Sequence, residues 1–115
     1  MMHSKKVKVL FIVAMLIMVA GTQAFADARL QGYWHWEGDL NTQLLINGSS
    51  FVWLWVDGTT FTGTVSVSGN LATFMATHAR GTDNVWRSHG EIWNYAISFQ
   101  TNNRLIINDW VYLRM

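Results

Sequence analysis

From residue 27 onward, short apolar runs alternate with polar residues at every second position, which is the period of a half-buried β-strand. The segment 60–68 shows this most clearly, with threonine and serine on one face and, on the other, Phe61, Gly63, Val65 and Val67. Segment 92–99 repeats the pattern, with its apolar face formed by Trp93, Tyr95, Ile97 and Phe99. The pattern predicts eight strands, at about 30–37, 42–47, 50–57, 60–67, 71–78, 92–99, 104–108 and 110–114.

The segments between these strands are mostly two to four residues long and rich in residues that tolerate a positive φ, as in Asn47-Gly48, Asp57-Gly58 and Gly69-Asn70. Parallel strands would need connections of a dozen residues or more, and segment 79–91 alone has that length. The chain is therefore predicted to be all-β, a small antiparallel up-and-down β-barrel of about eight short strands. A closed barrel removes unpaired strand edges and leaves room for side chains or one small ligand.

One predicted strand is apolar on both faces. In segment 50–56, Phe51, Trp53 and Trp55 alternate with valine and leucine, so both sides of the strand need cover. Alternation by itself leaves open which of the two faces points into the barrel.

The first 26 residues differ from the rest of the chain. Three lysines precede an apolar run of about a dozen residues, which ends at the small-residue site Ala24-Phe25-Ala26. This is the pattern of a secretory signal peptide, too short to span a bilayer as a helix. We expect cleavage after Ala26, a single mature domain over residues 27–115 without a membrane span, and a periplasmic or secreted location.

Removal of this segment changes the charge of the protein. The remaining 89 residues contain five arginines, no lysine and seven acidic residues, a formal net charge of −2. Without a basic stripe to neutralise phosphates, nucleic acid is not expected to be a partner. The chain also contains no cysteine, so disulfides, thiolate-bound metals and thiol nucleophiles are excluded. Instead, 14 of the 89 residues are aromatic, which favours a compact aromatic core.

A family resemblance follows from the opening of the first strand and from the later spacing of glycines and aromatics. Gly32-Tyr33-Trp34 matches the G-x-W motif that begins lipocalin-like and other calycin barrels. The later spacing, from Phe51 through Asp57-Gly58 and Gly63 to the final short strand, is similar to that of small exported bacterial lipocalin-like domains. The resemblance covers roughly residues 30–114 and implies the barrel fold, with Trp34 packed across one end. The chain is about half as long as a full lipocalin and lacks the later lipocalin motifs, so no ligand residue is implied.

Tryptophans at alternate positions put pairs of indoles on one side of a strand, where they can stack on an apolar or aromatic ligand. We therefore predict a binding protein for a small apolar or aromatic ligand, with candidate lining residues Trp34, Trp53, Trp55, Trp93 and Tyr95. The alternative is that these rings simply fill the barrel and cover one of its ends.

The segment 79–91 is the longest predicted loop, and long loops on rigid scaffolds often carry function. It contains Trp86 and Arg87, which are residue types enriched at interface hot spots. They are candidate partner-binding residues if the protein is an interaction module, such as a hydrolase inhibitor or an assembly subunit.

Catalysis and metal binding have no clear motif in the sequence. The histidines after residue 26 show no H-x-H, H-x-x-x-H or H-E-x-x-H spacing, and no G-x-S-x-G nucleophile motif is present. We accordingly expect no enzymatic activity, no metal and no cofactor.

Overall fold

The computed structural model describes residues 27–115, so the predicted signal peptide of residues 1–26 lies outside the described residues. The first element of the described residues is a 3₁₀ helix, η1 (Ala28–Leu30). Eight strands follow, namely β1 (Gly32–Trp36), β2 (Asp39–Asn47), β3 (Ser50–Leu54), β4 (Thr60–Ser68), β5 (Leu71–Arg80), β6 (Trp86–Thr101), β7 (Arg104–Ile107) and β8 (Trp110–Arg114). No helix within residues 27–115 is long and apolar enough to cross a membrane.

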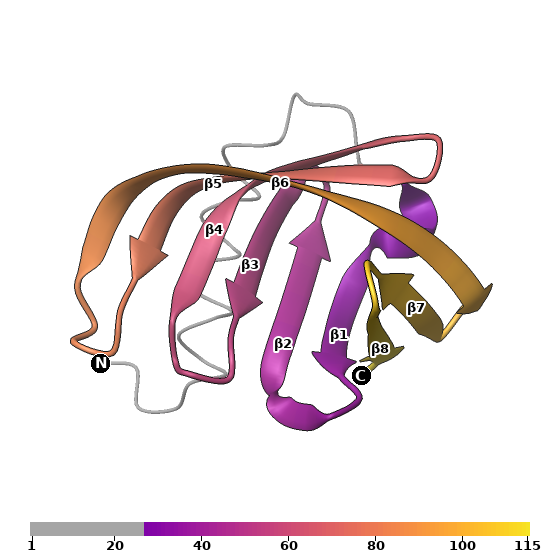
Figure 1. The fold of residues 1–115 in the computed structure, drawn as a ribbon, viewed down its shortest axis with the longest axis horizontal. Coiled ribbons are helices and arrows are strands. Elements are labelled where there is room, and N and C mark those ends of the chain that lie inside the picture. The colour runs from indigo at the N-terminus through magenta and orange to yellow at the C-terminus, as the bar shows by residue number, and fades with distance from the viewer. Residues whose placement is uncertain (1–26) are drawn as a thin grey trace.

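Each strand pairs antiparallel with the next one along the chain, and β1 also pairs with β8, which closes the sheet into a barrel. In Figure 1, β1 to β4 stand side by side while the long β6 curves over them. The predicted fold class, a closed up-and-down barrel of eight antiparallel strands, is confirmed.

The prediction of a loop over 79–91 is wrong. β5 continues to Arg80 and β6 begins at Trp86, so the connection comprises only residues 81–85. The two strands remain paired up to this turn, with Arg80 opposite Trp86. A register shift between Ala76 and His78 interrupts the alternation there. Because one extra residue moves all later side chains to the other face, the two-residue pattern is lost in the sequence although the strand continues.

The predicted strand 50–57 ends earlier than expected, at Leu54. Trp55 belongs to the following turn, where its carbonyl accepts a hydrogen bond from the Gly58 amide at 2.9 Å. The structure also decides which face of β3 points inward. Phe51 and Trp53 belong to the core cluster, so Val52 lies on the opposite face.

The alternation in β4 is confirmed on its apolar face but not fully on its polar face. Phe61 and Val65 are in the core, as predicted. On the other face Thr60 and Thr62 are buried, not solvated. The Thr62 hydroxyl donates to the Phe51 carbonyl at 2.9 Å, so its burial leaves no unmet hydrogen bond.

One end of the barrel is closed by η1 and Arg114. Trp34 is fully buried there, and its indole nitrogen donates to the Leu30 carbonyl at 3.0 Å. The Arg114 guanidinium lies 4.2 Å from the centre of the Trp34 ring. The same guanidinium donates to three backbone carbonyls, those of Arg29, Gln31 and Asn102. These contacts attach the first residues of the described chain to the last strand.

Candidate ligand-binding site

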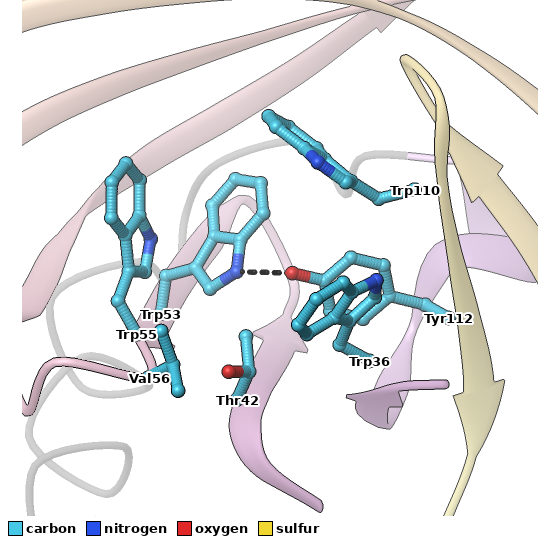
Figure 2. Close-up of a pocket in the computed structure, with 7 residues that line it drawn as sticks. All are labelled: Trp36, Thr42, Trp53, Trp55, Val56, Trp110 and Tyr112. Atoms are coloured by element: carbon cyan, nitrogen blue, oxygen red, sulfur yellow. Dashed lines mark hydrogen bonds between the residues drawn. The ribbon is translucent and has the colours of Figure 1, made fainter. Parts of the chain in front are cut away.

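A pocket of about 210 Å³ lies at the other end of the barrel, where the hairpins β1–β2, β3–β4 and β7–β8 turn. Its walls are four indoles, one phenol and two smaller side chains (Figure 2), namely Trp36, Thr42, Trp53, Trp55, Val56, Trp110 and Tyr112. All seven are uncharged, so the pocket offers aromatic and apolar surface with few polar atoms. A cavity of 150 Å³ is large enough for benzene, so this pocket can take one small ring.

Most of these side chains point into the pocket because they stand at every second position of a short strand. On β8, Trp110 and Tyr112 are two residues apart and both point inward. On β1, Trp36 lies on the same face as the buried Trp34. The turn after β3 adds Trp55 on the side of the pocket opposite β8, as Figure 2 shows.

Trp53 fills the middle of the barrel and forms the inner wall of the pocket. Its ring centre lies 4.8 Å from that of Phe74, and several other rings surround it at distances of up to 6.4 Å. The barrel is therefore filled by its own side chains at mid-height, and the cavity is confined to one end. A ligand here would be held near the end of the barrel and not along its axis.

The inner wall is held by a hydrogen bond between two of its rings. The Trp53 indole nitrogen donates to the Tyr112 hydroxyl at 2.9 Å (Figure 2). Burial raises the pKa of Tyr112 to about 12, because the ionised phenolate would lose its hydration; the bond from Trp53 partly opposes this rise.

This pKa predicts a loss of stability at alkaline pH. A tyrosine whose pKa is raised from 10 to about 12 contributes stability below pH 10 and loses it as pH rises through 12. We expect the free energy of unfolding to fall by about 2–3 kcal/mol between these two pH values because of Tyr112. Urea unfolding at pH 9 to 12 should show a steeper decline for the natural protein than for Tyr112→Phe. Parallel pH profiles for the two proteins would contradict the assignment.

Tyr112→Phe also controls for the other tyrosines in the pH profile. Burial also raises the pKa of Tyr33 and of Tyr95, and both tyrosines remain in Tyr112→Phe. The difference between the two profiles therefore isolates Tyr112.

The structure brings some of the five candidate ligand-binding residues to the pocket and leaves others elsewhere. Trp53 and Trp55 line it. Trp93 and Tyr95 pack behind them, with ring centres 6.1 and 6.2 Å from that of Trp53. Trp34 is not at the pocket, because it lies at the η1 end beneath Arg114.

Three aromatic residues of the pocket are not among the five candidate lining residues predicted from the sequence, namely Trp36, Trp110 and Tyr112. The sequence contains a signal for two of them, since Trp110 and Tyr112 stand two positions apart in the last strand, the spacing of residues that share one face. Thr42 has no such signal, because it stands in a mostly polar stretch at the start of β2.

Two polar atoms of the pocket-lining residues, the Thr42 hydroxyl and the Trp55 indole nitrogen, are buried without a hydrogen-bond partner in the described part of the chain. A buried polar group without a partner is costly, and a bound molecule that brought either atom to the surface of the cavity would relieve that cost.

The two candidate partner-binding residues lie on the first residues of β6, next to the β5–β6 turn. Arg87 forms an ion pair with Asp83 at 2.7 Å, and hydrogen bonding to Arg87 lowers the pKa of Asp83 to about 2. The guanidinium carbon of Arg80 lies over the Trp86 ring, 5.3 Å from the centre of that ring. Both residues are thus already engaged by neighbours in this hairpin.

Within residues 27–115, no group of three histidine or acidic side chains is arranged to hold a metal ion. No protein-family model, no curated protein and no solved structure matches this chain. The case for a function therefore depends on the pocket and on the sequence.

Proposed function

We propose that this protein is an exported binding protein with a lipocalin-like barrel, which holds one small apolar or aromatic ligand in its end pocket. The observation that carries the proposal is the 210 Å³ cavity walled by four tryptophans and a tyrosine. Pockets that bind small molecules are mostly apolar and aromatic, with a few polar groups that orient the ligand. Export is proposed from the signal-peptide pattern of residues 1–26.

The proposed role is binding and not catalysis, because the lining residues offer no acid, base or nucleophile suited to bond cleavage. A partner surface at Trp86 and Arg87 has weaker support, since Arg87 forms an ion pair with Asp83 and Trp86 packs against the Arg80 guanidinium. Native mass spectrometry of the protein isolated from the cell that exports it separates the two roles. A small co-purifying mass supports the pocket, and a discrete heavier complex supports a protein partner.

The proposal is tested most directly with toluene as a probe. The protein contains seven tryptophans, and each indole N–H gives its own signal in a nitrogen–proton correlation spectrum. We expect toluene to shift the indole signals of Trp36, Trp55 and Trp110 while leaving those of Trp34 and Trp86 in place. Uniform shifts, or none at all, would contradict a site in this pocket.

A matched pair of variants supplies the control. Trp110→Ala removes one wall of the pocket and is expected to weaken toluene binding by about tenfold, equivalent to about 1.4 kcal/mol. Trp86→Ala removes a tryptophan from the β5–β6 hairpin, which does not line the pocket, and should leave the toluene affinity unchanged. Equal effects of the two variants would point to a general loss of structure.

A further inference from the structure

Three aspartates stand in the hairpins whose residues wall the pocket, namely Asp39, Asp57 and Asp109. Asp39 is the cross-strand partner of Trp36 in the β1–β2 pair. Asp57 directly follows Val56, and Asp109 directly precedes Trp110. Each carboxylate is therefore adjacent, in sequence or in register, to a residue that lines the cavity.

The arginines of the described chain do not neutralise these three carboxylates. Three arginines are paired with other acids, as Arg29–Asp27, Arg87–Asp83 and Arg104–Glu37. Arg114 binds backbone carbonyls at the η1 end, and Arg80 stacks on Trp86. Within residues 27–115, no ion pair involves Asp39, Asp57 or Asp109. Arg80 also has no acidic partner among the described residues and lies opposite Thr60, beside the β3–β4 turn. Three unpaired carboxylates against this one arginine leave the pocket end of the barrel with net negative charge, which attracts cations.

The walls of the pocket favour the same sign of charge. The face of an indole or phenol ring is the negative end of its quadrupole, and tryptophan is the strongest of the aromatic residues in attracting a cation. Four indoles surround the cavity. An organic cation gains from the ring faces and from the aspartates together, whereas an anion is repelled by both.

Thr42 provides an independent indication of a ligand. The residue is 7% exposed, and its hydroxyl has no hydrogen-bond partner among the described residues. In Figure 2 its oxygen points toward Val56, another residue that lines the pocket. The lone pairs of this oxygen can accept a hydrogen bond from an ammonium N–H.

We infer that the ligand of this pocket is a small organic cation, an amine or quaternary ammonium that carries an apolar or aromatic group. The inference rests on the proposed function and adds the charge of the ligand. The cavity of about 210 Å³ suits a single ring with a short alkylammonium group.

The test compares three probes that share a benzyl group and differ in charge. Benzyltrimethylammonium is the cation, neopentylbenzene is its neutral isostere, and phenylacetate is an anion. Titrations of the full protein, followed by the indole signals of Trp36, Trp55 and Trp110, should give the cation an affinity about tenfold higher than that of the isostere. Phenylacetate should leave these signals unchanged.

The possible results separate the two proposals. If the neutral isostere binds as tightly as the cation or more tightly, the inferred ligand charge is wrong and the proposed binding function stands. If none of the three probes moves the pocket indoles, both proposals fail.

A charge-neutral variant tests the role of the aspartates. In the triple variant Asp39→Asn, Asp57→Asn and Asp109→Asn, the new side chains keep an oxygen that can accept the turn hydrogen bonds from Asn41 and Thr59. We expect its affinity for benzyltrimethylammonium to fall about fivefold while its affinity for neopentylbenzene stays the same. Asp27→Asn, at the η1 end, is the control and should change neither affinity. Unchanged cation affinity in the triple variant would overturn the role of the aspartates.

Salt provides a second measurement that a purely structural effect would not produce. Because 1 M salt shortens the screening length to about 3 Å, it should weaken cation binding in the natural protein. The triple variant should show little of this salt dependence. An equal salt dependence in both proteins would contradict electrostatic attraction by the three carboxylates.

The contribution of Thr42 is measured with a primary amine. Thr42→Val should weaken benzylammonium, which can donate a hydrogen bond, by about fivefold. It should leave benzyltrimethylammonium unaffected, since that cation has no N–H. Equal losses for both cations would show that the hydroxyl does not accept a hydrogen bond from the ligand.

Discussion

Replacing Trp34 with alanine is expected to destabilise the protein by about 3–5 kcal/mol, a large part of the total stability of a domain of this size. The side chain is fully buried, and its removal leaves a cavity beneath the Arg114 guanidinium. It also leaves the Leu30 carbonyl without the hydrogen bond from the indole. Thermal unfolding should show a decrease in Tm of more than about 12 °C.

Two further variants distinguish the ring from its N–H group. Trp34→Phe keeps an aromatic ring under Arg114 and should cost about 1–2 kcal/mol. Trp86→Ala removes a half-buried tryptophan and should cost less than Trp34→Ala. If Trp34→Ala unfolds at the same temperature as Trp86→Ala, the closed end of the barrel does not depend on Trp34.

Replacing Gly63 with alanine is expected to cost at least about 2 kcal/mol, because β4 and β5 approach each other too closely for a side chain. A Cβ atom at this position would lie 1.8 Å from the Met75 carbonyl oxygen and 3.0 Å from the Thr77 nitrogen. The register shift between β4 and β5 occurs at this point, between Thr62 and Gly63. The backbone of β5 would have to move, and the bulge would be lost.

The sign of this effect distinguishes the steric contact from local propensity. Alanine is favoured over glycine within a strand by about 0.5–1 kcal/mol, so propensity alone predicts that Gly63→Ala is stabilising. Gly90 provides the control, since a Cβ atom there would meet nothing within 4 Å. Urea unfolding of Gly90→Ala should be within about 0.5 kcal/mol of the natural protein or slightly more stable. A neutral Gly63→Ala would contradict the close approach.

Much of the barrel could be predicted because its determinants are local. The alternation in β4 and in the second half of β6 assigns the inward face of each strand, and Gly48, Gly58 and Gly69 have positive φ at hairpin turns. The errors occur where the local pattern is interrupted. The bulge near Ala76 hides the end of β5 and the beginning of β6, so a continuous hairpin was predicted as a loop.

The pocket was predicted only in part, for a different reason. Trp53 and Trp55 stand out as an indole pair in an apolar run, whereas Trp36 and Trp110 reach the same cavity from opposite ends of the described chain. The sequence near either residue does not indicate the position of the other, because both line the cavity only once β1 pairs with β8. The sequence does not distinguish Trp34 from Trp36 as a pocket residue, yet Trp34 is covered by Arg114 and Trp36 lines the pocket.

The sequence by itself determined the class of fold, the number of strands and the inward face of most of them, since these follow from a two-residue period and from turn residues that act within a few positions. Only the tertiary structure decided that Trp53 fills the middle of the barrel, that a cavity remains at one end and that the hairpins with Asp39, Asp57 and Asp109 meet at that end. These features depend on barrel closure and on the stagger between strands, which bring together side chains that are distant along the chain.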